Sequence, residues 1–108
     1  MASCTDISRF DISVGSIFVP TVGSQTHQDN CRLGVGNQSV AVQLLQWDIN
    51  TCYGLNIAED GIFGPQTEGA VQYVQALGGV TQDGIYGPVT RSIMRWYVFG
   101  PGACRLGF

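Results

Sequence analysis

The sequence predicts a mainly α fold, a small three-helix bundle with an N-terminal β-hairpin extension and two disulfides. Three observations lead to this prediction. Apolar residues recur at helical spacing in three segments after residue 38, the segment 9–22 alternates apolar and polar residues, and the cysteines are even in number. With 108 residues, 44% of them apolar and 12% charged, the chain has the size and composition of one folded domain.

The segment RFDISVGSIFVPTV, residues 9–22, predicts a β-hairpin that turns around Gly15. Phe10, Ile12 and Val14 alternate with polar residues and would share one face. Pro20 has no N–H to donate to a sheet, which indicates an edge strand, so we expect the hairpin to lie over the rest of the fold. The polar stretch that follows it predicts a loop.

The first two helices are predicted from apolar stripes with recognisable start and stop signals. The first covers about residues 39–52, with Ser39 as its N-cap and an apolar stripe of Val42, Leu45, Ile49 and Cys52. The second begins at Pro65 and stops at Gly78 and Gly79. Its buried stripe consists of Ala70, Val71, Val74 and Leu77.

A third helix is predicted to begin at Pro88 and to continue until Gly100 and Pro101. Its apolar positions are Ile93, Met94, Trp96 and Tyr97. Arg91 and Arg95 are four residues apart and would line its solvated face. The tail after it shows no period, and its cysteine indicates that it is pinned to the fold.

One motif occurs twice, as DGIFGPQT over residues 60–67 and as DGIYGPVT over residues 83–90. Aspartate can close an Asx turn, glycine can adopt a positive φ, and proline can open a helix. We therefore expect structural roles for the turn residues Asp60, Gly61, Gly64, Asp83, Gly84 and Gly87. Ile62 and Ile85 can point inward, and Phe63 and Tyr86 can fill the core.

The two motifs and the segments between them resemble the bacterial peptidoglycan-binding domain type 1 family. The resemblance rests on V-x-x-L-Q-x-x-I (42–49), on the two motifs, and on A-V-x-x-V-Q (70–75), and it covers roughly residues 34–98. It implies a small three-helix fold and noncovalent attachment of secreted wall-active enzymes to peptidoglycan. We therefore expect an extension with the hairpin over residues 1–33 and the three-helix domain with its pinned tail over residues 34–108.

Peptidoglycan offers hydroxyls, amides, carboxylates and apolar sugar faces, so its groove should pair aromatic rings with polar groups. Polar residues at the helix starts and aromatic residues near them are the candidates for ligand contact, although caps and core packing are the common alternatives. These candidates are Gln66, Thr67, Thr90, Arg91, Trp47, Tyr53, Tyr86 and Trp96. Gln46 and Gln75 occupy equivalent places, and such residues usually hydrogen-bond a neighbouring loop.

Charge and composition argue against several other functions. Five arginines, no lysine and a net charge of −3 do not make a nucleic-acid surface, and the apolar stretches are too short to cross a membrane. His27 is the sole histidine, so a Ser–His–Asp set or a metal site is not expected, and neither is a cofactor. A carboxylate pair among the eight acids stays open as a catalytic alternative.

The cysteines permit three pairings, among which we favour Cys4–Cys31 with Cys52–Cys104. Disulfides indicate an oxidising compartment, so we expect a secreted, extracellular or cell-wall-associated protein. The expected function is non-catalytic peptidoglycan binding through glycan or stem peptide, with a wall-active enzyme or another secreted protein as a further partner. The alternative is a secreted protein-interaction domain, an inhibitor or effector, that binds through the exposed hairpin segment GSIFVP.

Overall fold

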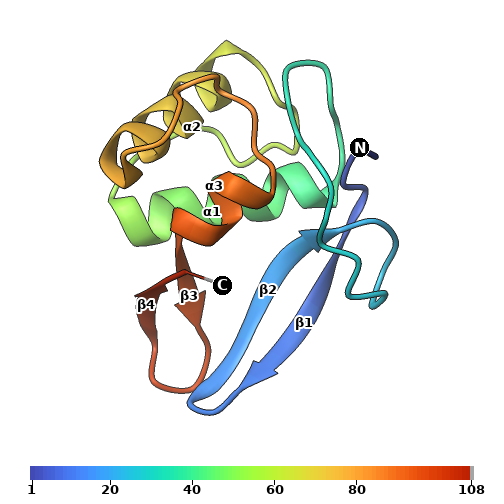
Figure 1. Ribbon diagram of the computed structural model, residues 1–108, viewed down its shortest axis with the longest axis vertical. Helices are drawn as coiled ribbons and strands as arrows, with labels where there is room; N and C mark the ends of the chain where they lie inside the picture. The colour runs from blue at the N-terminus through green and yellow to red at the C-terminus, as the bar shows by residue number, and fades with distance from the viewer. Residues whose placement is uncertain (108) are drawn as a thin grey trace.

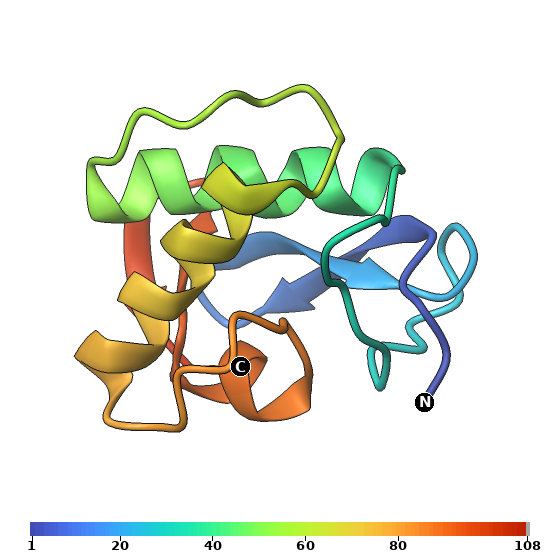
Figure 2. The ribbon, with the colours of Figure 1, turned by 90° about the horizontal axis from the view of Figure 1, so that it is seen from above.

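A hairpin, three helices and a second hairpin follow one another along the chain. In the computed structural model, which describes residues 1–107, the elements are β1 (Asp6–Ile12), β2 (Gly15–Thr21), α1 (Val40–Tyr53), α2 (Pro65–Gly78), α3 (Pro88–Ile93), β3 (Arg95–Val98) and β4 (Ala103–Leu106). Figure 1 shows the helices in its upper half and the two hairpins below them. Turned by 90°, Figure 2 shows the long loop between α1 and α2 running back along α1.

The predicted mainly α three-helix bundle is wrong. The helices account for 32% of the chain, and four strands form two small sheets. The error lies after Ile93, where α3 ends and Arg95–Val98 pairs antiparallel with Ala103–Leu106. Trp96 and Val98 are buried while Arg95 is exposed, which is the alternation of a strand. Aromatic and β-branched residues favour this pleated, half-buried surface once a partner strand is present.

The starts and ends of the first two helices agree with the sequence prediction. The Ser39 hydroxyl accepts the N–H of Val42, and Gly54 ends α1 with a left-handed backbone (φ 69°). Gly64 and Pro65 open α2, and Gly79 ends it in the same left-handed conformation (φ 72°). Within residues 1–107, the helices are too short and too polar to span a bilayer.

The first hairpin forms part of the core and does not merely cover it. β1 and β2 pair antiparallel, with Ile12 opposite Gly15. Ile17 and Val19 are buried beneath α1, and Pro20 is buried as well. Close packing against the second hairpin explains Gly15, because a Cβ there would lie 2.1 Å from the Phe99 carbonyl oxygen.

Two disulfides join the chain ends to the interior, in the pairing that the sequence analysis favoured. Cys4–Cys31 joins the N-terminus to the loop before α1, and Cys52–Cys104 joins the end of α1 to β4. The tail is therefore pinned, as expected. One core cluster includes residues of the first hairpin, the helices and β3.

Candidate functional site

Gln46 of α1 organises the first motif from inside. This buried side chain donates through Nε2 toward the Asp60 carboxylate (3.2 Å), the Ile62 carbonyl (3.0 Å) and the Thr67 hydroxyl (3.0 Å). Its Oε1 accepts the N–H of Gly61 at 2.9 Å. The amide thus fixes the turn and the start of α2 together.

Gln75 of α2 does the same for the second motif. Its Nε2 donates toward Asp83 (2.9 Å), the Ile85 carbonyl (3.0 Å) and the Thr90 hydroxyl (3.0 Å). Its Oε1 accepts the N–H of Gly84 at 3.0 Å. The expected role of both glutamines as loop-bonding residues is confirmed by these contacts.

The two aspartates form turns. Asp60 accepts the N–H of Ile62 and Asp83 that of Ile85, each at 3.0 Å. The Ile62 and Ile85 N–H bonds, and then the glutamine amides, lower the pKa of these carboxyls below the usual value. Local donors therefore keep both carboxylates ionised, and the role of both aspartates is to stabilise their own turns.

The aromatic residue of each motif is buried and the isoleucine before it is exposed. Phe63 and Tyr86 are 1% and 0% exposed, whereas Ile62 and Ile85 are 48% and 37% exposed. The expectation that the isoleucines point inward is wrong. Consecutive residues of an extended segment point to opposite sides, so burying the aromatic ring turns its neighbour outward.

Several candidate contact residues lie inside the fold. Thr67 and Thr90 are buried and bonded to the glutamine amides. Tyr86 and Trp96 lie in the core, and the Trp96 indole donates to the Arg91 carbonyl at 3.0 Å. Their rings are closed to a ligand in this conformation.

The other candidates are nearer the surface, but most already have partners. The Arg91 guanidinium donates to the Asp29 carbonyl at 2.8 Å and lies 3.4 Å from its carboxylate. The exposed Gln66 accepts the N–H of Ala58 at 3.0 Å. Trp47 stacks on Phe99, with ring centroids 5.9 Å apart and an angle of 6° between the planes.

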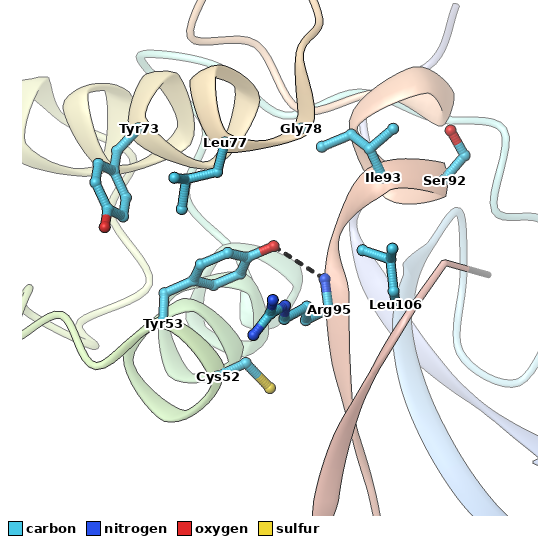
Figure 3. Close-up of a pocket in the computed structure, with 9 residues that line it drawn as sticks. All are labelled: Cys52, Tyr53, Tyr73, Leu77, Gly78, Ser92, Ile93, Arg95 and Leu106. Atoms are coloured by element: carbon cyan, nitrogen blue, oxygen red, sulfur yellow. Dashed lines mark hydrogen bonds between the residues drawn. The ribbon is translucent and has the colours of Figure 1, made fainter.

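Tyr53, the remaining candidate, lines a pocket of about 570 Å³ between the ends of α1 and α2, α3 and the second hairpin. We call it the Tyr53 pocket, and its volume lies within the range of ligand sites. Figure 3 shows its lining: Cys52, Tyr53, Tyr73, Leu77, Gly78, Ser92, Ile93, Arg95 and Leu106. The Tyr53 hydroxyl accepts the N–H of Arg95 at 3.0 Å, which ties α1 to β3 across the pocket.

The lining combines apolar surface with a single charge. Tyr73, Leu77 and Leu106 are 46%, 61% and 73% exposed, so a ligand can reach them. Arg95 is the one charged residue among the nine that line the pocket. Burial raises the pKa of Tyr53 above its usual value, so its hydroxyl stays neutral and can also serve as a hydrogen-bonding group.

Sequence reasoning named Tyr53 and missed Tyr73, Leu77, Arg95 and Leu106 as members of this site. Leu77 was assigned to the buried stripe of the second helix and Arg95 to a helix that has already ended. One signal was available, because Tyr73 and Leu77 are four residues apart and therefore neighbours on the surface of α2.

A second pocket, of about 750 Å³, lies beside the second motif. Its Gln75 side chain already donates to two other lining residues, Asp83 and Thr90. Within residues 1–107, no three His, Cys, Asp or Glu side chains are grouped so that they could hold a metal ion. The Tyr53 pocket is therefore the better candidate for a ligand site.

The two motif turns and the starts of the helices that follow them are organised in the same way, by Gln46 and by Gln75. Residues 38–94, more than half of the chain, match the family described as "Putative peptidoglycan binding domain". The chain belongs to this family, whose domain is a binding unit and is not catalytic by itself. A search of curated proteins gives no match to the chain.

Proposed function

We propose that this protein binds bacterial peptidoglycan without cleaving it, and that the Tyr53 pocket holds the bound segment. Membership of a peptidoglycan-binding family supports the polymer as the ligand. The observation that carries the choice of site is the pocket's composition, in which two tyrosines and three aliphatic residues surround one arginine. Such a site contacts apolar faces and polar groups of a ligand at the same time.

Several groups that could take part in hydrolysis are engaged in structural contacts. The four cysteines form disulfides, and the His27 ring donates to the Arg9 carbonyl at 2.9 Å, far along the chain from the pocket. Asp60 and Asp83 are held by their own turns. These assignments support binding without turnover, and the disulfides support an oxidising, extracellular location.

The structure gives less support than the sequence to the alternative function, a protein-interaction domain. That alternative rests on an exposed GSIFVP segment, but Ile17, Val19 and Pro20 are buried. Most of the apolar surface of this segment therefore belongs to the core. A stoichiometric protein partner without wall retention would restore this alternative.

Co-sedimentation with purified, insoluble peptidoglycan tests the proposal. We expect the wild-type protein to pellet with the polymer and to release no soluble fragments. The double substitution Tyr73→Ala with Leu77→Ala should reduce retention about tenfold or more, because it removes exposed apolar contact area from the pocket.

A matched control is Val35→Ala with Val40→Ala, since these side chains are 61% and 43% exposed and line none of the described pockets. The control should pellet like wild type. Failure of the wild-type protein to pellet, or equal losses in both double variants, would overturn the proposed function or its site.

A further inference from the structure

The one charged residue that lines the Tyr53 pocket, Arg95, indicates which chemical class of ligand the pocket can bind. Arg95 projects from β3, is exposed, and has no acidic residue beside it in the lining. Among residues 1–107, no ion pair and no side-chain hydrogen bond is formed by its guanidinium, whereas Arg91, four residues earlier, is bonded to Asp29. The pocket therefore offers an uncompensated positive charge.

The placement of that charge is fixed by the backbone. The Arg95 N–H donates to the Tyr53 hydroxyl, and Arg95 pairs with Leu106 across the β3–β4 hairpin. The Cys52–Cys104 disulfide holds this hairpin against α1. Figure 3 shows Arg95 extending from the strand toward Tyr53 and Cys52, opposite Leu77 and Tyr73. A ligand in the pocket would have its charged end near Arg95 and its apolar part near α2.

A guanidinium binds a carboxylate through two parallel hydrogen bonds, an arrangement that a neutral sugar cannot reproduce. The opposite wall is apolar, with Tyr73, Leu77 and Ile93, and it suits small aliphatic groups better than a ring of hydroxyls. Peptidoglycan contains both kinds of ligand, because its glycan strands carry short peptides that contain alanine and free carboxylates.

On the basis of the proposed function, we infer that the Tyr53 pocket binds the carboxylate end of a peptidoglycan stem peptide, not the glycan strand. Arg95 binds the carboxylate, and Tyr73 with Leu77 contacts the alanine methyl groups. The affinity for such a peptide falls as salt is raised, because an exposed charge pair is screened.

Calorimetric titration of the intact, oxidised protein with three soluble probes tests the inference. The probes are diacetyl-lysyl-D-alanyl-D-alanine, which has one carboxylate, its C-terminal amide, and the neutral glycan chitotetraose. We expect the free acid to bind about tenfold or more tightly than the amide, since a charge-assisted pair is lost in the amide. Chitotetraose should show no binding in the same range.

Arg95→Gln should remove the preference for the free acid while leaving the backbone bond to Tyr53 in place. The control is Arg105→Gln, because Arg105 is exposed on the neighbouring strand, carries the same charge and does not line this pocket. Its free-acid affinity should equal that of wild type.

Equal affinity for acid and amide, binding of chitotetraose in place of the peptide, or equal effects of the two arginine substitutions would overturn the inference. If whole peptidoglycan still retains the protein in that case, the proposed function stands and only the assignment to the stem peptide fails. If the wild-type protein is not retained on whole peptidoglycan, the proposed function itself fails. Failure of the function and failure of the stem-peptide assignment can therefore be distinguished.

Discussion

The two motifs have the same internal hydrogen bonds but different helices before them. Gln46 lies 14 residues before its aspartate and Gln75 lies 8 residues before its own. After Gln46, α1 continues for seven residues to Tyr53, whereas α2 continues for only three residues after Gln75, to Gly78. The motif thus specifies the turn and the helix start. The two preceding helices have the same length, but their glutamines lie at different positions along them.

The longer part of α1 that follows Gln46 builds one wall of the pocket. It places Cys52 where it can bond Cys104 and Tyr53 where it can accept the Arg95 N–H.

A second contrast lies two residues after each glutamine. Asp48 is buried by β3, but Leu77 remains 61% exposed. The neighbouring elements, not the motif, decide which helix surface is closed and which stays open to a ligand.

The largest predicted effect concerns Asp48. Because this buried group can titrate, the free energy of unfolding should depend on pH. Burial raises its pKa from 3.8 to about 7, although the Tyr97 N–H bond acts in the other direction. The folded chain therefore holds a proton that the unfolded chain has lost between these values. This contribution to stability is full below about pH 4 and is lost as pH rises through about 7.

We expect the free energy of unfolding to fall by about 4 kcal/mol from this group between about pH 4 and about pH 8. Urea denaturation across that range measures it. Asp48→Asn should flatten the decline, because the amide oxygen can still accept the Tyr97 N–H and carries no charge. An unchanged pH profile in this variant would show that another group titrates.

Removing the glutamine amides should give the next largest effect and should distinguish the two motifs. Gln75→Ala leaves the Gly84 N–H without its partner in a buried place, whereas Gln46→Ala leaves that of Gly61, which is only partly buried. We expect losses of about 3 kcal/mol and about 2 kcal/mol respectively, because water can reach Gly61 more easily.

Urea denaturation also measures these losses. Gln43→Ala is the control, since Gln43 is exposed and donates one bond, to the Glu59 carbonyl, so its loss should stay below about 1 kcal/mol. If both glutamine substitutions lower the free energy of unfolding equally, exposure of the turn does not determine the loss.

Substitutions at the aromatic position of the motifs, Phe63 and Tyr86, should change the free energy of unfolding least. The Tyr86 hydroxyl is buried and has no hydrogen-bond partner among residues 1–107, whereas the first motif has phenylalanine there. Tyr86→Phe should raise the free energy of unfolding by about 1 kcal/mol, because it removes an unsatisfied polar group. The reciprocal Phe63→Tyr should lower it, and thermal unfolding of both variants tests the pair. A loss in Tyr86→Phe would contradict this explanation.

Local signals were sufficient for much of the fold. Caps and stripes predicted α1 and α2, and the motifs predicted the Asx turns at Asp60 and Asp83. The third helix failed because Met94 to Val98 satisfies a helical stripe and a strand alternation equally well. What selects the strand is its partner, Ala103–Leu106, which has no pattern of its own and pairs only in the folded chain.

The candidate site was less predictable because five elements contribute to it. Tyr53 could be named as an accessible aromatic residue, but its neighbours Tyr73, Arg95 and Leu106 come from separate parts of the chain. Thr67 and Thr90 were candidates for ligand contact because they follow the repeated turns at the helix starts. In the folded chain the glutamine amides approach them from within. Which residues contact ligand stays a prediction.

The disulfide pairing has a mechanical consequence. Tension applied before Cys4 and after Cys104 would pass through the first disulfide to Cys31, along residues 31–52, and through the second disulfide to Cys104. Residues 53–103 form a closed covalent loop outside that load path. Both motifs and most of the pocket lie in this loop, so tension between the two ends of the chain would strain α1 before it stretched the chain that forms the site.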